Sequence, residues 1–484
     1  MSKLEPSPKP FLTLNPFDPA CKAFAIETRN LFLDEPANRE GPLGQNSPLR
    51  QDILLGDIER VKVFISNYKS PSARSQALQL AADGGHADCV KLLIPLADAR
   101  SDDSLALRRA AYMGHLECVK LLLPESDPNI HSQALALAAH SGSLDCLAAL
   151  LPFCEPGENN SLALVVAAQS GHAACVELLL PFCPSQEGYF DALCLAAFNG
   201  HCKCVALLAP ACSPSCKSSA PLRLAAGYGH DECVELLIPL SPSIDDRYSA
   251  LAAAARAGHA RCVKLLIPAS CPGTLGSQPL FLAASGGHTE CVKLLIPESA
   301  IEDIQSTALV NAVRAKSPEC VRLVMQAAGP NPKGFVDAVL MGVQQKNTAC
   351  LCVLVSEHAP AKAPLWPPRD ALAAFHHHRK LNAALRASAT NGVRDAAQAI
   401  VGLATPHGIF LAADAALLNG HLAIAQDMIN LIPKNKLRSL RKSALAGGAH
   451  CSDFLDSLIE REALGSAIAP PSAAPVSSHR KSRL

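Results

Sequence analysis

The sequence predicts an all-α solenoid, in which short helix pairs stack one after another along the chain. Three observations support this fold class. A Gly-His pair recurs at intervals of 29 residues, with one interval of 28. Each repeat contains two apolar blocks with the periodicity of helices. A proline follows the second block in eight successive repeats, at Pro95, Pro124, Pro152, Pro181, Pro210, Pro239, Pro268 and Pro297. A period of about 20 to 50 residues is typical of solenoids and related arrays.

Two columns of residues set the register of the repeat. The histidines of the Gly-His pairs form one column, in which Ser143 takes the place of a histidine, and cysteines form a second column three residues later. The histidine column is His86, His115, His172, His201, His230, His259 and His288. The cysteine column is Cys89, Cys118, Cys146, Cys175, Cys204, Cys233, Cys262, Cys291 and Cys320. The repeated phrase that these columns mark is clear over about 76–325.

Each repeat reads as two short helices. The first block, such as Ala77 to Ala82, is rich in alanine, which lets neighbouring helices approach closely, and it ends at a glycine that can adopt the left-handed turn after a helix. The second block, such as Cys89 to Ile94, presents a broad apolar face. We expect the proline after it to end the second helix, because proline lacks an N–H and crowds the preceding turn. A single helix pair cannot bury enough apolar surface to be stable alone, so the stability of the array must come from stacking of neighbouring pairs.

The phrase Leu-Ala-Ala-x-x-Gly-His-x-x-Cys-Val-x-Leu-Leu-Ile resembles the helix–turn–helix half of the ankyrin repeat. Ankyrin repeats are about 33 residues long, and their Thr-Pro-Leu-His opening is reduced here to forms such as Gln278-Pro-Leu-Phe281. The missing residues belong to the β-hairpin finger. The resemblance therefore implies an ankyrin-like helical solenoid with reduced β-hairpin fingers.

The composition argues against binding by bulk electrostatics. Lys+Arg and Asp+Glu are both 43, which gives no net attraction to nucleic acid or to an anionic membrane. No apolar run reaches the ~18 residues that a membrane-spanning helix needs, and the first residues lack the apolar segment of a secretory signal. We expect a soluble, cytoplasmic, monomeric protein with no nucleic-acid or membrane partner.

The chain divides into four predicted parts. Residues 1–50 are rich in Pro, Ser and Asn, and we expect a disordered arm. Residues 51–325 form the regular array, with a more polar capping unit at its start. Residues 326–464 form divergent helical repeats with an insertion near 356–370, where four prolines and the single Trp366 lie. Residues 465–484 form a flexible tail rich in Ala, Pro and Ser.

The histidine and cysteine columns are expected to be structural. Members of one column lie one repeat apart, about 10 Å, which is too far for a disulfide or for two ligands on one metal ion. The cysteines read as small buried core residues, and the histidines as turn residues that tie neighbouring repeats by hydrogen bonds. No catalytic or phosphate-binding motif is present. We expect no catalytic site, no metal and no cofactor.

The candidate functional residues lie on the first helices. In an ankyrin-like stack, the two positions after Ala-Ala and the position before Leu-Ala-Ala point to the concave side. Aromatic and arginine side chains there are the usual anchors of protein interfaces, although packing between neighbouring first helices would also account for them. The predicted partner-binding residues are Arg108, Tyr112, Met113, His140, Phe198, Arg223, Tyr228, Arg256, Phe281 and Arg314.

These observations favour a non-catalytic scaffold that binds a protein partner on the concave side of the solenoid. The near-identical repeats also resemble bacterial ankyrin proteins, some of which are delivered into host cells, so the chain is a candidate effector acting in a host cytosol. Two alternatives remain open at this stage. The divergent region 330–465 is the catalytic part of an enzyme whose repeats choose the substrate, or the chain is a purely structural spacer.

Overall fold

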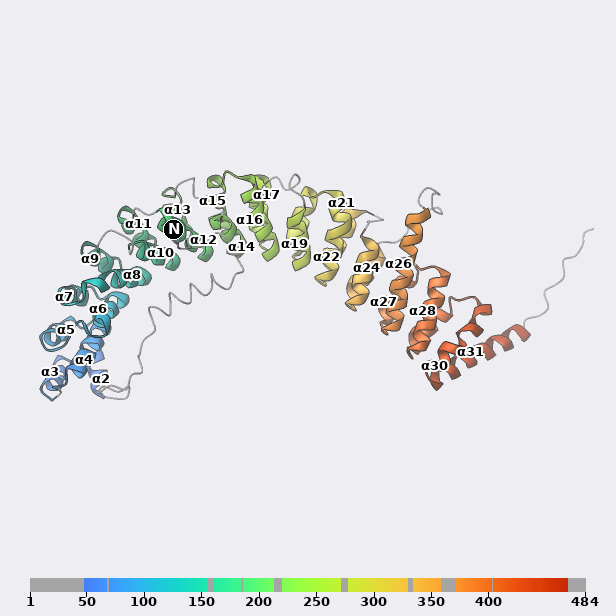
Figure 1. Ribbon diagram of the computed structural model, residues 1–484, viewed down its shortest axis with the longest axis horizontal. Helices are drawn as coiled ribbons and strands as arrows, with labels where there is room; N and C mark the ends of the chain where they lie inside the picture. The colour runs from blue at the N-terminus through green and yellow to red at the C-terminus, as the bar shows by residue number, and fades with distance from the viewer. Residues whose placement is uncertain are drawn as a thin grey trace, which may run out of the picture. The chain divides into compact units, whose positions relative to one another are not determined.

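The computed structural model describes residues 48–67, 69–154, 160–183, 186–212, 220–270, 277–329, 334–357, 371–402 and 404–468. All regular secondary structure within these ranges is helical (Figure 1). The prediction of an all-α repeat fold is therefore confirmed. The predicted arm up to residue 47, most of the insertion near 356–370, and the tail from 469 lie outside the described residues. The first described helix begins at Pro48, within the segment predicted as the arm.

The helices group into two compact units that divide after Pro279, inside the array predicted as continuous. In unit 1 the first helices of the repeats are α2 (Pro48–Leu54), α4 (Pro71–Asp83), α6 (Ser101–Met113), α8 (His131–Ser141), α10 (Asn160–Ser170), α12 (Gln186–Asn199), α14 (Ala220–Tyr228) and α16 (Ile244–Ala257). The second helices are α3 (Ile58–Asn67), α5 (Ala87–Leu93), α7 (Leu116–Leu122), α9 (Leu144–Leu150), α11 (Ala173–Leu179), α13 (Cys202–Leu208), α15 (Asp231–Leu237) and α17 (Ala260–Ser270). First helices pack on first helices, and second helices on second helices (Figure 1).

Unit 2 continues the helix pairs with less regular lengths. After α19 (Gln278–Gly286), which spans the division, come α20 (Thr289–Leu295), α21 (Ile301–Asp303), the π-helical turn η9 (Ile304–Ala308), α22 (Leu309–Arg314), α23 (Pro318–Ala328), α24 (Phe335–Gln344), α25 (Thr348–Glu357), α26 (Ala371–Thr390), α27 (Arg394–Val401), α28 (Pro406–Leu418), α29 (Leu422–Ile429), the 3₁₀ turn η11 (Lys434–Leu440), α30 (Arg441–Ala446) and α31 (Ala449–Ile468). The last helix thus includes the first four residues, 465–468, of the predicted tail.

The prolines end most second helices in the way that the sequence predicts. In five repeats of unit 1 the α-helix gives way to a short 3₁₀ turn that contains the proline, as in η2 (Ile94–Leu96), η3 (Leu123–Glu125), η5 (Leu151–Phe153), η6 (Leu180–Phe182) and η7 (Ile238–Leu240). The prediction is wrong for α17, where Pro268 lies inside the helix. The Ser270 hydroxyl donates to the Leu266 carbonyl at 2.7 Å in that last turn, which helps to hold the helix past the proline.

Alanine, cysteine, valine and leucine form the core between the two layers. In the second repeat, Ala81, Cys89, Val90 and Leu93 have no exposed surface. The cysteines of the column are buried free thiols. Burial is the main cause that raises the pKa of the Cys233 thiol to about 12, so this side chain stays protonated. The structure thus confirms the cysteines as small core residues, which do not act as reactive thiolates.

The column histidines join each repeat to the preceding one. The Nε2–H of His230 donates to the Phe198 carbonyl at 2.9 Å, across 32 residues of sequence. Equivalent bonds run from His86 to Leu54 at 2.7 Å, from His115 to Asp83 at 3.0 Å, from His172 to His140 at 3.0 Å, and from His201 to Gln169 at 3.0 Å. Because a carbonyl only accepts, these bonds fix the proton on Nε2. The predicted role of the histidines is confirmed.

The glycine of a Gly-His pair makes room for the imidazole of the next repeat, so that this ring can reach its carbonyl. Gly200 has φ +77°, in the left-handed region that glycine adopts without steric cost. The His230 ring lies directly against its Cα, so that a Cβ at this position would overlap the imidazole. Each tie therefore depends on two features of the Gly-His pair, the backbone freedom of one repeat's glycine and the ring of the next repeat's histidine.

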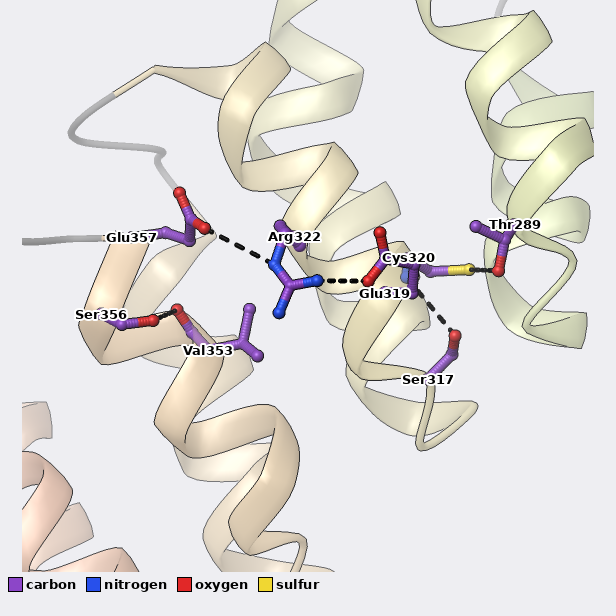
Figure 2. Close-up of polar contacts among 8 residues, drawn as sticks. All are labelled: Thr289, Ser317, Glu319, Cys320, Arg322, Val353, Ser356 and Glu357. Atoms are coloured by element: carbon purple, nitrogen blue, oxygen red, sulfur yellow. Dashed lines mark hydrogen bonds and ion pairs between the residues drawn. The ribbon is translucent and has the colours of Figure 1, made fainter.

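Two turns of unit 2 replace this tie with a cap on their own helix. Ser317 stands in the histidine column, and its Oγ accepts from the Cys320 N–H at 3.4 Å, while the Cys320 Sγ lies 3.7 Å from Thr289 Oγ1 (Figure 2). At the next turn, the Asn347 side chain accepts from the Cys350 N–H at 3.3 Å. These are N-cap bonds within one second helix, so neither side chain links two repeats in the way that histidine does.

A different polar tie, across 23 residues, occurs in both units and joins a first helix to the residue just before the next helical segment of the following repeat. In unit 1, Ser104 Oγ accepts from the Asp127 N–H at 2.9 Å. In unit 2, Asn382 Nδ2 donates to Thr405 Oγ1 at 2.8 Å, and Asn382 Oδ1 accepts from the Thr405 N–H at 3.1 Å. In that part of unit 2 the turn is tied as well, because His421 Nε2 donates to the Thr390 carbonyl at 3.2 Å. Among the described helices, none is long and apolar enough to cross a bilayer.

Candidate functional site

Eight of the predicted partner-binding residues lie on the first helices of unit 1, and we call the surface that they form the inner face. Its members are Arg108, Tyr112, Met113, His140, Phe198, Arg223, Tyr228 and Arg256. None is buried: Met113 is 49% exposed, Arg256 is exposed, and the others are half-buried. In Figure 1 the first helices of unit 1 lie along the inside of that unit's own curve.

The first aromatic pair of the inner face joins α6 to α8. The rings of Tyr112 and His140 stack with centroids 6.0 Å apart. The same His140 contacts the next repeat, because its Nδ1 lies 2.9 Å from Ser170 Oγ on α10. Its carbonyl accepts from His172 Nε2. His140 therefore contacts the preceding repeat through its ring, and the next repeat through both its Nδ1 and its carbonyl.

The second aromatic pair joins α12 to α14. Phe198 and Tyr228 meet edge to face, with ring centroids 4.3 Å apart. The Phe198 carbonyl accepts from His230, so one residue carries both the exposed ring and the backbone group that the next repeat holds. The two rings remain half-buried and leave part of their surface open to solvent.

Polar side chains complete the links between neighbouring first helices. Arg109 Nη1 donates to Asp83 Oδ1 at 3.0 Å between α6 and α4, and Asn199 Nδ2 donates to the Gln169 carbonyl at 3.2 Å between α12 and α10. Together with the ring contacts and the His140–Ser170 bond, every neighbouring pair of first helices from α4 to α14 is joined at the inner face. Sequence reasoning missed Arg109 and Ser170. For Arg109, the spacing of 26 residues from Asp83 was a usable signal.

The charge of the inner face is one-sided. From α6 to α16, the three columns that define it hold Arg108, Arg223 and Arg256 and no aspartate or glutamate. Arg108 also donates to two carbonyls of its own helix, Asp103 at 3.2 Å and Asp102 at 3.1 Å. The face therefore combines aromatic surface with positive charge, although the whole chain carries no net charge.

Two of the predicted residues belong to the other unit. Phe281 is half-buried on α19, and Arg314 is exposed on α22. Both lie after the division at Pro279. The sequence interpretation predicts one surface for all ten residues, of which eight lie in unit 1 and two in unit 2. Within the described residues, no group of three or more histidine, cysteine, aspartate or glutamate side chains could hold a metal ion.

Comparison with known proteins assigns the repeat pattern to a family. The family model "Ankyrin repeats (3 copies)" matches residues 51–134, 135–219, 193–274 and 268–333, more than half of the 484-residue chain. None of the curated proteins matches the chain. The human ASB11 ankyrin repeat domain is 21% identical, covers 52% of this chain and 98% of its own, and has a TM-score of 0.23. A circular tandem repeat protein is 13% identical, covers 87% of this chain and 95% of its own, and has a TM-score of 0.14.

Proposed function

Because the chain belongs to the ankyrin repeat family, we propose that it is a non-catalytic scaffold that binds a protein partner on the inner face of unit 1. Ankyrin repeats typically mediate protein–protein interactions. The observation that supports this site is the set of half-buried or exposed aromatic and arginine side chains that share one face while their neighbours are buried alanines. Aromatic and arginine residues of this kind dominate the binding energy of protein interfaces.

The ties described above support this proposal through preorganisation. Binding costs about 0.5–1.5 kcal/mol for each flexible side chain that becomes ordered. On the inner face, Tyr112, His140, Phe198 and Tyr228 are already held by ring contacts, and two of their carbonyls are held by histidines of the next repeat. A partner would therefore meet side chains whose positions are largely fixed before it arrives.

The same contacts would serve ordinary packing between repeats if the face bound nothing, and an experiment separates the two roles. The full chain carrying Tyr112→Ala, Phe198→Ala and Tyr228→Ala is used to capture partners from a lysate, which are identified by mass spectrometry. If the face binds protein, we expect the partners of the wild-type chain to be lost, since truncation of an interface anchor costs about 2 kcal/mol or more. Retention of the same partners by a folded triple variant would refute the proposal.

A matched control removes exposed aromatics elsewhere in unit 1. Phe153 and Phe182 lie in the 3₁₀ turns after the second helices and are 58% and 43% exposed. The double variant Phe153→Ala and Phe182→Ala removes comparable ring surface away from the inner face. We expect it to keep the wild-type partners. Circular dichroism of both variants establishes that the helical fold is retained.

The proposal extends to where the scaffold acts. The resemblance of the near-identical repeats to bacterial ankyrin proteins supports a role as an effector in the cytosol of a host cell. Residues 1–50 would then carry the delivery signal. A translocation reporter fused to these residues tests this part, and a reporter that stays in the producing cell would restrict the scaffold to that cell's own partners.

A further inference from the structure

The two aromatic pairs of the inner face are separated by a polar interval. Tyr112 and His140 bridge α6 and α8, and Phe198 and Tyr228 bridge α12 and α14. Between them, α10 presents Gln169 and Ser170, which take part in hydrogen bonds to the neighbouring helices. The face thus offers two apolar contact points, with no aromatic side chain on the helix midway between them.

The spacing of these pairs sets a length. The midpoints of the two pairs are three repeats apart, and packed helices lie about 8–10 Å from axis to axis. The apolar contact points are therefore about 24–30 Å apart. An extended chain covers about 3.3 Å per residue, so two side chains that reach both points would be about seven to nine residues apart.

The arginines lie at the two ends of this span. Arg108 is on α6, one turn before Tyr112, while Arg223 is on α14 with Tyr228, and Arg256 follows on α16. The three columns contain no acidic residue from α6 to α16. A partner whose charges complement this face carries acidic groups outside its two apolar anchors. The zero net charge of the chain disfavours nucleic acid, which is bound mainly through a strong excess of basic residues.

We infer that the partner segment of the inner face is an extended, acidic peptide with two large apolar side chains about seven to nine residues apart and carboxylates at both ends. This inference rests on the proposed function and specifies the chemistry of its partner. The occupant of the inner face is then a linear segment of a protein. A single-stranded RNA is the competing occupant, which the test must reject.

The test begins with random 16-residue peptides displayed on phage and selected on the immobilised full chain. We expect the selected peptides to share two large apolar residues at the stated spacing and Asp or Glu on either side. Synthetic fluorescein-labelled versions are then titrated by fluorescence anisotropy. Changing the interval to four or to thirteen residues should weaken binding about tenfold or more, because only one anchor can then be seated.

A matched pair of arginines in one repeat tests the charge. Arg256 is exposed on α16, and Arg261 is 88% exposed on α17, where it pairs with Asp231 at 3.4 Å. Arg256→Glu should weaken binding of the selected peptide about tenfold or more, since like charges then face each other. Arg261→Glu should change it less than about twofold. Replacing the peptide's acidic residues by lysine should restore binding to the Arg256→Glu chain.

Several results would overturn the inference. The selected peptides could be basic or lack the paired apolar residues, or no peptide could survive selection on the folded chain. The affinities could also fail to depend on the interval between the two apolar residues. Displacement of the peptide by micromolar poly(U) would favour a single-stranded RNA as the occupant. The proposed function can be judged separately. If the captured partners still require Tyr112, Phe198 and Tyr228 while the peptides lack these features, only the partner chemistry is wrong.

Discussion

The turn between the two helices of a repeat is built differently in unit 1 and at the first divergent turns of unit 2, although His421 Nε2 of unit 2 again donates to a preceding carbonyl, that of Thr390, at 3.2 Å. In unit 1 a left-handed glycine is followed by a histidine, whose side chain leaves its own helix uncapped and reaches the preceding repeat. In the first divergent turns of unit 2, Lys316 and Lys346 take the left-handed position with φ +58° and +53°. Ser317 and Asn347 then cap their own helices. One column position thus either links repeats or stabilises a single helix.

The difference has a consequence for the inner face. In unit 1 the acceptor carbonyls belong to residues of the first-helix columns, including His140, Gln169 and Phe198. Stability of the turn and position of the surface side chains are therefore coupled across repeats. In unit 2 other contacts link the second helices, such as Arg322, which contacts Glu319 on its own helix and lies 3.7 Å from Glu357 on α25 (Figure 2). Such an exposed ion pair contributes about 0–1 kcal/mol.

The largest expected effect comes from a methyl group at the glycine. Gly200→Ala places a Cβ against the His230 ring and also forces alanine into the left-handed region. The left-handed backbone conformation costs alanine about 1–2 kcal/mol, and the overlap of its Cβ with the imidazole costs about 1–3 kcal/mol. We expect urea unfolding, followed by circular dichroism, to show a loss of about 3 kcal/mol in the transition that includes unit 1.

Gly420 provides the control for this substitution in unit 2. It has nearly the same backbone, with φ +75°, but no side chain lies within 4 Å of the position that a Cβ would take. Gly420→Ala should therefore cost only the backbone term, about 1–2 kcal/mol. Equal losses for the two variants would mean that the imidazole yields freely and that the tie does not constrain the turn.

Removal of the His230 imidazole should lower the stability of unit 1 somewhat less than Gly200→Ala does. His230→Ala leaves the Phe198 carbonyl without its donor, and a half-buried acceptor that loses its partner costs about 1–3 kcal/mol. Hydrogen exchange should increase in the last turn of α12 as well as in the first turn of α15.

Ser317→Ala, which removes only an N-cap, should cost about 1 kcal/mol and raise exchange in the first turn of α23 alone. Faster exchange confined to α15 in His230→Ala would show that the tie does not couple repeats.

A substitution that restores glycine should stabilise unit 2. Lys316 adopts φ +58°, which costs a side chain other than glycine about 1 kcal/mol. Lys316→Gly should therefore raise the stability of unit 2 by about 0.5–1 kcal/mol, after the greater entropy of glycine in the unfolded chain is subtracted. Lys62→Gly, in the middle of the exposed surface of α3, should instead destabilise by about 1 kcal/mol. A loss of stability in Lys316→Gly would argue that the lysine side chain makes a contact of its own.

Mild acid should weaken unit 1 first. Burial lowers the pKa of His201 below its usual 6.5, against the opposing effect of its bond to the Gln169 carbonyl, and the neighbouring His230 and His172 lower it further. The unfolded chain then binds the proton more tightly, so this contribution to stability is present above pH 6.5 and is lost as the pH falls through the folded-state pKa. His201→Gln keeps a donor without a titrating group and should flatten the dependence of unit 1 stability on pH over this range.

The Arg394–Asp427 ion pair of unit 2 responds to acid at a lower pH than His201 does. The hydrogen bond from Arg394 lowers the pKa of the Asp427 carboxyl below 3.8, so its contribution persists above that pH and is lost only as the pH falls through the lowered value. Unfolding midpoints measured from pH 7 to 4.5 should therefore fall for unit 1 while this pair is unaffected. Coincident loss in both units over that range would contradict the assignment.

Sequence reasoning predicted the repeat, the helix pairs and the roles of the cysteine and histidine columns, because each follows from periodicity and residue type alone. It also selected Tyr112, His140, Phe198 and Tyr228. It could not show that these rings pack in pairs, because that depends on the offset between neighbouring helices. The helical course of α17 past Pro268 was missed for a similar reason. The local motif is unchanged there, and the difference arises from contacts beyond the motif.

Whether a partner binds the inner face is tested by hydrogen–deuterium exchange of the full chain with and without a captured partner. We expect the partner to slow exchange in the last turns of α6, α8, α12 and α14, where the two aromatic pairs lie, and to leave the second helices α5 to α15 unchanged. Protection on the second helices, or in unit 2 alone, would contradict binding on the inner face.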